Sequence, residues 1–200
     1  MKRLFLSLVL GVALSGPAMA ASYNIDANHT QVNFTYLHNG FANLGGRLNQ
    51  VSGTLDFDAQ NPAKSSIDVQ IPMASLSTGV PRLDTHMASA DFFDVEKFPT
   101  ATFKSSKVTV LGKDKLSVAG DMTIHGVTRP AVLDVTINRM GVHPMRKVPA
   151  VGFEATTTIK RSEFGVGGML QAASDEVKLR IAMEASEPKP EAAATPAPVK

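Results

Sequence analysis

Eight stretches of the chain alternate apolar and polar residues with a period of two, and this pattern constrains the fold most. Side chains of a β-strand point to opposite faces in turn, so each stretch has one apolar face. No comparable run has helical spacing, so the sequence predicts an all-β domain, a barrel or a sandwich, with one apolar interior. The apolar members of the eight stretches are Val32, Phe34 and Tyr36; Val51, Leu55 and Phe57; Ile67, Val69, Ile71 and Met73; Val108 and Val110; Leu116, Val118, Met122 and Ile124; Leu133, Val135 and Ile137; Val151, Phe153 and Ile159; and Val177, Leu179, Ile181 and Met183.

Residues 1–20 have the three parts of a secretory signal peptide. Lys2 and Arg3 precede an apolar run, which ends at the small-residue site Ala18-Met19-Ala20. The run is too short to span a bilayer comfortably, so we expect cleavage after Ala20 and no stable membrane anchor. The chain has no cysteine, which excludes disulfides and a lipoprotein anchor. We therefore expect an exported protein, located in a bacterial periplasm or in the extracellular space.

Charge and composition set the domain organisation and argue against nucleic acid as a partner. The chain has 20 basic and 18 acidic residues, and loss of Lys2 and Arg3 makes the two numbers equal. Phosphate binding needs a basic surplus, which is missing here. From Glu187 the chain is rich in proline and alanine, and it has too little apolar area to offset the entropy of ordering. We predict one domain over residues 21–186 and a disordered tail over residues 187–200.

Turn residues predict how neighbouring strands pair. A two-residue loop at His125-Gly126 pairs Ile124 with Val127, and glycine at the second position suits a type I′ turn. Pairing the apolar faces on either side of Gly112-Lys113-Asp114 needs an odd number of loop residues, so we predict a three-residue turn there. Phe103 is out of phase with Val108, which predicts a bulge near Ser105-Ser106.

A long connection, residues 74–99, separates the third stretch from the fourth. Leu83, Met87 and Ala90 have the spacing of a short amphipathic helix, and Asp84 suits its first turn. Three phenylalanines follow in the loop, too many to leave in water. They predict either a plug for the core or a lid over a cavity. The three are Phe92, Phe93 and Phe98.

Three arginines, Arg47, Arg129 and Arg161, fall in the apolar phase of the pattern. Each can lie near a strand end with its guanidinium in water. Alternatively, one of them meets a polar ligand group at the mouth of a barrel. Burial of an unpaired arginine is costly, so we expect any that points inward to have an acidic or a ligand partner.

Five blocks of sequence, in order along the chain, carry a family resemblance. The longest is residues 83–103, LDTHMASADFFDVEKFPTATF. The others are residues 23–26 with 29–30, residues 120–128, residues 161–165 and residues 174–177. Together they resemble the YceI-like family of exported polyisoprenoid-binding proteins, and they span almost the whole predicted domain.

The resemblance implies an eight-stranded antiparallel barrel similar to a lipocalin, with a long loop and short helix between strands three and four. It also implies that a polyisoprenoid or isoprenoid quinone is threaded through the interior, with no other cofactor and with a membrane-side quinone donor or acceptor as partner. Strands of roughly ten residues give a tunnel of about 25 Å. His86 and Arg161 are the candidates for contacts with the polar head group. The predicted ligand-binding residues are Phe34, Tyr36, Leu55, Phe57, Ile71, His86, Phe92, Phe93, Phe103, Met122, Ile124, Leu133, Val135, Phe153, Ile159, Arg161 and Ile181.

An enzyme is the first rival of a carrier. Asp56 and Asp58 could form a pair of catalytic carboxylates, but they share the predicted polar face of one strand, so we interpret them as solvated. No Gly-x-Ser-x-Gly nucleophile motif is present, and thiol chemistry is absent without cysteine. We therefore predict a binding protein and assign no catalytic residue.

A metal-binding protein and a structural protein with a solid core also compete with the carrier. The five histidines lack the spacing of metal ligands, although His29, His38 and His86 could still converge in space. A sandwich with a solid core would show the same alternation as a barrel. The sequence therefore favours a lipid carrier or scavenger, with no metal ligand assigned, and leaves the filling of the interior open.

Overall fold

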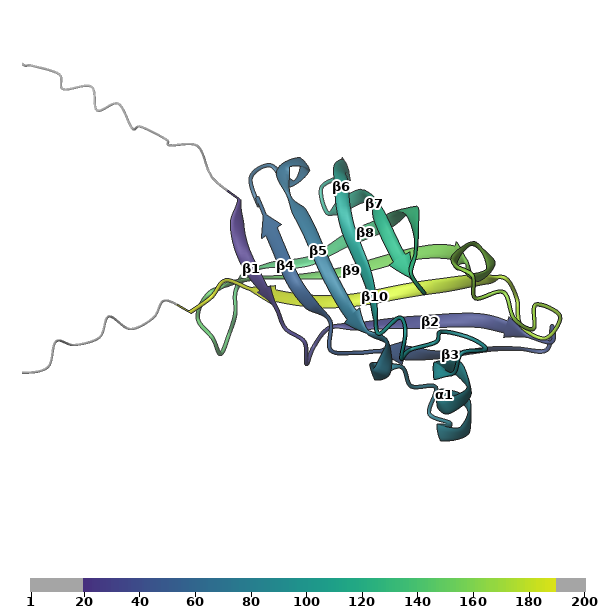
Figure 1. Cartoon of the computed structure of the whole chain (residues 1–200). Coiled ribbons are helices and arrows are strands. Elements are labelled where there is room, and N and C mark those ends of the chain that lie inside the picture. The colour runs from purple at the N-terminus through teal and green to yellow at the C-terminus, as the bar shows by residue number, and fades with distance from the viewer. Residues whose placement is uncertain (1–19, 190–200) are drawn as a thin grey trace, which may run out of the picture.

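A computed structural model describes residues 20–189, so the predicted signal peptide before Ala20 and the predicted tail beyond Lys189 lie outside the described residues. Ten antiparallel strands and one α-helix make up most of the described chain (Figure 1). The strands are β1 (Ala21–Ile25), β2 (Gln31–His38), β3 (Ala42–Leu48), β4 (Ser52–Phe57), β5 (Ser66–Pro72), β6 (Thr100–Gly112), β7 (Lys115–Ile124), β8 (Val127–Val142), β9 (Pro149–Lys160) and β10 (Glu176–Ser186). The helices are α1 (Pro81–Ala88) and the 3-10 turns η1 (Pro62–Lys64), η2 (Met73–Ser75) and η3 (Arg161–Phe164).

Eight of these strands close into the predicted antiparallel barrel, in the order β1-β4-β5-β6-β7-β8-β9-β10. The ring closes where Asn24 lies opposite Ser186 and Ile25 opposite Ala185. The number of barrel strands is therefore confirmed, but one of the eight was identified wrongly. β1 belongs to the ring although it is too short to show a repeated alternation, and β2, which alternates clearly, lies outside it.

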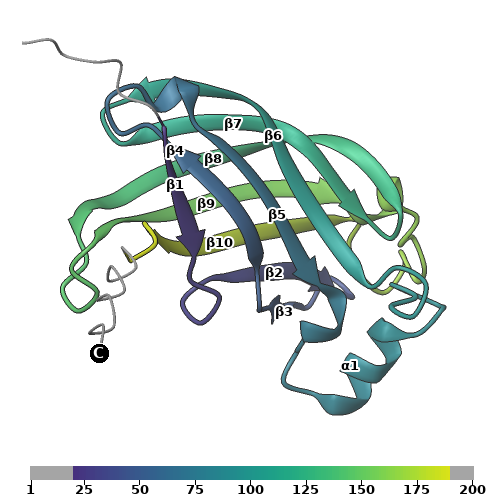
Figure 2. The ribbon, with the colours of Figure 1, turned by 60° about the vertical axis from the view of Figure 1, so that its left-hand side comes forward.

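One edge of β10 is shared by β1 and β2, and the barrel wall forks there (Figure 2). β2 pairs with β10 from Lys178 to Ala182, after which the edge passes to β1. β1 continues the wall to β4, whereas β2 continues it to β3. The two branches meet again where Arg47 and Ser77 exchange two backbone hydrogen bonds of 2.9 Å. The fork widens one end of the barrel, and α1 lies at that end.

β3 was not predicted, because two adjacent glycines interrupt any alternation. A Cβ atom on Gly45 would overlap the carbonyl oxygen of Phe34, and one on Gly46 would lie 2.7 Å from the Phe34 ring. Glycine therefore lets β3 lie close against β2, and seven residue pairs join the two strands. β3 is therefore determined by the close approach of its backbone to β2, and it has no apolar face that the sequence could reveal.

The predicted turns are confirmed at two places and corrected at a third. His125 and Gly126 have φ angles of 51° and 73°, and Ile124 lies opposite Val127, as a type I′ hairpin requires. The register shifts between Ser105 and Lys107, at the predicted bulge. The three-residue turn is wrong: Gly112 pairs with Lys115 around a two-residue turn, and the odd residue is a bulge between Val110 and Gly112.

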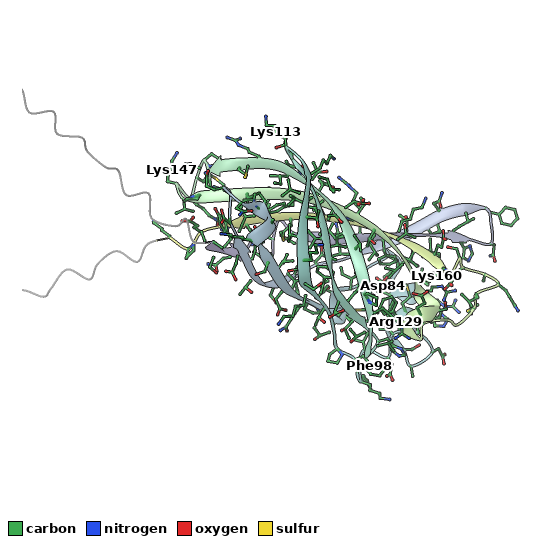
Figure 3. All side chains as sticks on the ribbon, turned by 90° about the horizontal axis from the view of Figure 1, so that it is seen from above. Asp84, Phe98, Lys113, Arg129, Lys147 and Lys160 are labelled. Atoms are coloured by element: carbon green, nitrogen blue, oxygen red, sulfur yellow. The ribbon has the colours of Figure 1, made fainter. Side chains whose placement is uncertain are left out.

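Aromatic rings fill the end of the barrel away from α1. Phe57 packs edge to face on Tyr23 and on Phe153, with centroids 6.1 Å and 5.5 Å apart. Leu55 and Val135 are also buried in this core. Figure 3 shows the turns that carry Lys113 and Lys147 at one end of the molecule, and Asp84, Arg129 and Lys160 at the other. The closed end and the α1 end are therefore different environments.

Asp26 joins β1 to the loop between β8 and β9. Its Oδ2 accepts a hydrogen bond of 2.6 Å from Arg146 and lies 3.1 Å from the Nδ1 atom of His29, while Oδ1 accepts from the Asn28 amide at 3.0 Å. Burial alone would raise the pKa of this carboxyl, but hydrogen bonds from His29 and Asn28 and the charge of Arg146 outweigh burial and lower it.

The Asp26 cluster predicts a pH-dependent stability. A carboxyl whose pKa is lowered by folding stabilises above its unfolded pKa, about 3.9, and that stabilisation is lost as the pH falls through the folded value. We expect Asp26→Asn to lower the free energy of unfolding by about 2 kcal/mol at pH 7. The difference from wild type should shrink below about pH 4 in urea titrations at several pH values. Asp121→Asn, at an exposed position on β7, should change little at any pH; a difference that is constant with pH would contradict the assignment.

Candidate functional site: an apolar cavity beneath the α1 loop

A cavity of about 380 Å³ lies inside the forked end of the barrel. This volume is within the range of sites for small organic ligands. Inward-facing side chains of β2, β5, β6, β7 and β10 form its walls, and the α1 loop and the segment after η3 complete it. The wall is predominantly aliphatic and aromatic, with few polar side chains. Such a site binds by burying apolar surface and is unsuited to a highly charged substrate.

Five methionines contribute to this wall, and they make it adaptable in shape. Thioether side chains are unbranched and polarizable, so they fill irregular gaps and tolerate ligands of varied outline. They come from separate elements, including η2, α1, β7 and β10, so the adaptable surface surrounds the space. These residues are Met73, Met87, Met122, Met169 and Met183.

The α1 loop forms a lid over the cavity. α1 begins with Pro81, and Asp84 in its first turn accepts hydrogen bonds from the Thr78 amide at 2.7 Å and from the Thr78 hydroxyl at 2.6 Å. These hydrogen bonds lower the pKa of the Asp84 carboxyl. Leu83, His86 and Met87 of α1 all line the cavity. The predicted helix is therefore confirmed, although Ala90 lies beyond its end.

Two of the three phenylalanines of the loop fit the predicted lid, and the third has neither predicted role. Phe92 and Phe93 line the cavity, and the Phe92 ring meets His86 edge to face at 4.9 Å. Phe98 does not line the cavity and packs on the His125 ring at 4.5 Å. The lid interpretation thus holds for Phe92 and Phe93, whereas Phe98 attaches the end of the loop to the β7–β8 turn.

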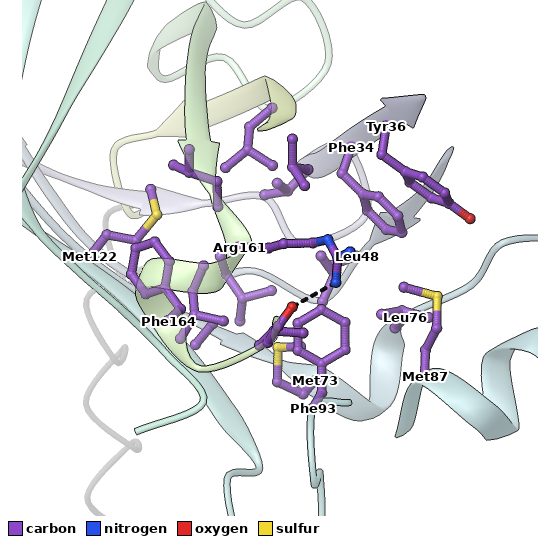
Figure 4. A pocket seen from close by; sticks show the side chains of 18 of the residues that line it. Phe34, Tyr36, Leu48, Met73, Leu76, Met87, Phe93, Met122, Arg161 and Phe164 are labelled. Atoms are coloured by element: carbon purple, nitrogen blue, oxygen red, sulfur yellow. Dashed lines mark hydrogen bonds between the residues drawn. The ribbon is translucent and has the colours of Figure 1, made fainter. Parts of the chain in front are cut away.

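Arg161 is the cation of the cavity wall, and it is 9% exposed. Its guanidinium lies between Phe34 and Phe93, with one of its hydrogen bonds drawn in Figure 4. Nε donates to Ser174 O at 2.9 Å, Nη1 to Val166 O and Gly168 O at 2.7 Å each, and Nη2 to Ala173 O at 2.8 Å.

Four of the five N–H donors of Arg161 are therefore used by backbone carbonyls, and the fifth, on Nη2, has no acceptor among the described residues. Burial lowers the pKa of the guanidinium, and the nearby Asp175 carboxylate opposes this effect. Asp175 itself accepts hydrogen bonds from the Ser162 amide and hydroxyl, at 2.9 and 2.8 Å. An acidic or a ligand partner was expected for an inward arginine; the direct protein partners are four backbone carbonyls, and a ligand partner stays a prediction. Arg47 and Arg129 are exposed, as expected near strand ends.

The structure brings thirteen of the seventeen predicted ligand-binding residues to the cavity wall, and leaves four outside it. Those on the wall are Phe34, Tyr36, Ile71, His86, Phe92, Phe93, Phe103, Met122, Ile124, Leu133, Ile159, Arg161 and Ile181. The other four, Leu55, Phe57, Val135 and Phe153, face inward but are buried in the closed-end core. The predicted tunnel is therefore corrected to a cavity with one packed end. Which wall residues contact a ligand stays a prediction.

Sequence reasoning missed wall residues that come from irregular segments. Leu76 follows η2, and Phe164, Val166 and Met169 lie in and after η3. No periodic pattern marks such positions, because each is placed by its loop. Val32, Val177 and Leu179 also line the cavity, and their alternation had already identified them as inward-facing.

The metal site and the carboxylate pair that the sequence left as alternatives can be compared with the described residues. Within residues 20–189, no group of three or more His, Asp or Glu side chains is arranged to hold a metal ion, and no helix is long and apolar enough to cross a membrane. The interpretation of Asp58 as solvated is wrong: it is 4% exposed. Its Oδ1 accepts hydrogen bonds from the amides of Gln60 and Asn61 at 2.9 and 2.8 Å, which is a structural role in the turn after β4.

The fold and the cavity together define a lipocalin-like antiparallel β-barrel with an apolar pocket at one end. A profile of the YceI-like domain matches residues 23–185, so the chain belongs to the YceI-like family. A UPF0312 protein of Pseudomonas putida strain W619 is 38% identical over 193 residues, covering 94% of this chain and 100% of the relative. A UPF0312 protein of Ectopseudomonas mendocina strain ymp is 40% identical over 187 residues, covering 92% and 97%.

Solved structures show the same fold. BcnA of Burkholderia cenocepacia is similar with a TM-score of 0.73 at 26% identity, covering 80% of this chain and 98% of BcnA. A polyisoprenoid binding domain from Saccharophagus degradans is similar with a TM-score of 0.67 at 15% identity, covering 85% and 99%. At that low identity, the second likeness concerns the fold alone.

Proposed function

We propose that this protein is an exported, periplasmic carrier or scavenger that binds the apolar tail of a polyisoprenoid or isoprenoid quinone in the barrel cavity. The observation that carries the proposal is the cavity itself, whose wall is almost wholly apolar and lies beneath the α1 loop. The solved polyisoprenoid binding domain adds that a barrel of this fold can serve such a ligand. Binding without catalysis fits a wall that lacks clustered acid, base and nucleophile groups.

The physical basis of binding is the removal of the tail from water. Burial of apolar surface contributes about 25 cal/mol per Å², and the tail would gain most of its affinity in this way. The methyl branches of an isoprenoid need an uneven wall, which the five methionines can provide by adjusting their rotamers. A cavity of about 380 Å³ also disfavours the hypothesis of a solid core.

The polar head group would lie near the lid. Arg161 offers the Nη2 N–H that has no protein acceptor among the described residues, and His86 lies at the lid with its ring exposed. A carbonyl, hydroxyl or phosphate oxygen could accept from either group. A membrane-side donor or acceptor of the lipid is the partner that this function requires.

Mass spectrometry of an organic extract from the natively purified protein tests the proposal. We expect a prenyl lipid in stoichiometric amount from the wild type. Leu179→Trp places a larger ring inside the cavity, and we expect at least about tenfold less lipid, because overpacking costs on the order of 1–3 kcal/mol. Lys178→Trp, on the outer face of the same strand, should retain the lipid. The chain has no other tryptophan, so the fluorescence of each variant also reports its environment.

Absence of any extractable lipid from the wild type, together with no binding of an added isoprenoid quinone, would contradict the proposal. Equal lipid in the two tryptophan variants, both shown to be folded by circular dichroism, would place the ligand somewhere other than this cavity.

A further inference from the structure

Three segments at the end of the barrel where the cavity lies carry no charged side chain, whereas the α1 loop at the same end carries Arg82 and Asp84. Residues 36–46, 76–80 and 165–173 contain no Asp, Glu, Lys or Arg, although charged residues make up 19% of the chain. We call these three segments the rim. Solvent-facing loops normally carry charged groups, so three neighbouring uncharged segments beside one opening are unusual for a surface that faces only water.

The three rim segments are joined to one another in space. The amide of Asn39 donates to Ala172 O at 2.7 Å, and His38 forms a β-bridge with Ala173. Arg47, directly after the first segment, forms the β-bridge with Ser77 in the second. The rim is therefore one continuous feature of the fold, assembled from parts far apart in sequence.

Large apolar side chains project from the rim. Phe41 is 92% exposed after a tight turn in which Asn39 and Gly40 have φ angles of 49° and 72°. Met169 is 61% exposed, and Val80 is 53% exposed. These side chains belong to three separate segments of the rim. Projecting apolar groups of this kind suit insertion between lipid chains.

The rim also contributes to the cavity wall. Leu44 and Met169 are 41% and 61% exposed to solvent and also line the cavity, so each of them joins the outer surface to the interior. A lipid tail that moved along this surface would meet no charged group of the rim.

We propose that the rim docks on the surface of a lipid bilayer, with Phe41 and Met169 inserted among the lipid chains, so that the cavity opens directly toward the membrane. This proposal rests on the proposed carrier function, because it describes how the ligand enters and leaves. The attraction comes from burial of apolar side chains, since the rim contains no charge. Docking should therefore depend little on ionic strength.

Flotation of the purified protein with vesicles of phosphatidylethanolamine and phosphatidylglycerol tests the proposal. The double variant Phe41→Ser with Met169→Ser should reduce the bound fraction by about tenfold or more, because two apolar anchors are lost. The matched control is Leu111→Ser with Met145→Ser, which removes side chains that are 64% and 82% exposed. Leu111 lies next to the β6–β7 turn that carries Lys113, and Met145 lies in the β8–β9 loop that carries Lys147, both at the opposite end. The control should bind vesicles as wild type does, at low and at high salt.

The outcomes separate docking from the carrier function. Wild-type protein that carries lipid but does not float with vesicles, or a rim variant that floats as well as wild type, overturns docking and leaves the carrier function intact. Protein that floats through the rim but never holds lipid supports docking and contradicts the carrier function. A dimer in light scattering that disappears only in the rim variant, without vesicle binding, makes the rim an interface between copies and also overturns docking.

Discussion

Phe153→Ala should lower the free energy of unfolding by about 4 kcal/mol and leave lipid retention almost unchanged. Phe153 is 7% exposed and packs edge to face on Phe57 at 5.5 Å, so alanine would leave a void in the closed-end core. Removal of a buried phenylalanine costs about 3–5 kcal/mol. Phe153 does not line the cavity, so its removal should not change what the cavity binds. Urea denaturation measures the first effect, and mass spectrometry of extracted lipid measures the second.

Phe93→Ala is the matched comparison, because Phe93 is half-buried and lines the cavity. It should lose much more lipid than Phe153→Ala and destabilise the fold less, because Phe93 borders the cavity and is less buried than Phe153. The opposite ranking, with lipid lost in Phe153→Ala and kept in Phe93→Ala, would mean that the ligand extends into the closed end. The comparison therefore tests the division of the interior into core and cavity.

The sequence predicts which side chains face into the barrel, but it does not predict which part of the interior is core and which part is cavity. Alternation reports which side chains point into the barrel, and Phe34 and Phe153 satisfy it equally well. The alternation does not report where along the barrel axis a side chain lies, relative to the fork in the wall. The fork in turn depends on β1 and β3, whose sequences lack a repeated apolar pattern. The inward phase was thus predictable, and the boundary between filled and open interior was not.

Loops set the other limit on prediction. The α1 loop was identifiable because its helix has a regular spacing and its phenylalanines need cover. The segment after η3 offered no such signal: residues 165–173 contain glycines and small side chains, yet Val166 and Met169 form part of the cavity wall. The carbonyls of this segment accept hydrogen bonds from the buried side chain of Arg161, which no spacing rule predicts.

Arg161 organises this segment, and its replacement should have an equally large effect. Its four hydrogen bonds reach carbonyls between Val166 and Ser174, so one side chain joins both ends of this segment to η3. Hydrogen bonds from a charged donor contribute more than neutral ones, and buried carbonyls left without donors are destabilising. The arginine therefore holds one wall of the cavity, in addition to any contact with a head group.

Arg161→Met should lower the free energy of unfolding by about 4 kcal/mol, because methionine retains the apolar stem but donates no hydrogen bond. Amide hydrogen exchange in residues 165–175 should increase well above that of β6 and β7, and lipid retention should fall because the wall is no longer held. Arg161→Lys keeps the charge, but its single ammonium cannot reach all four carbonyls, so it should recover only part of the loss. Unchanged exchange in residues 165–175 in a folded Arg161→Met protein would show that the segment is positioned by its own packing. An Arg161→Met protein that is as stable as the wild type but retains no lipid would instead show that Arg161 contacts the ligand and does not hold the segment.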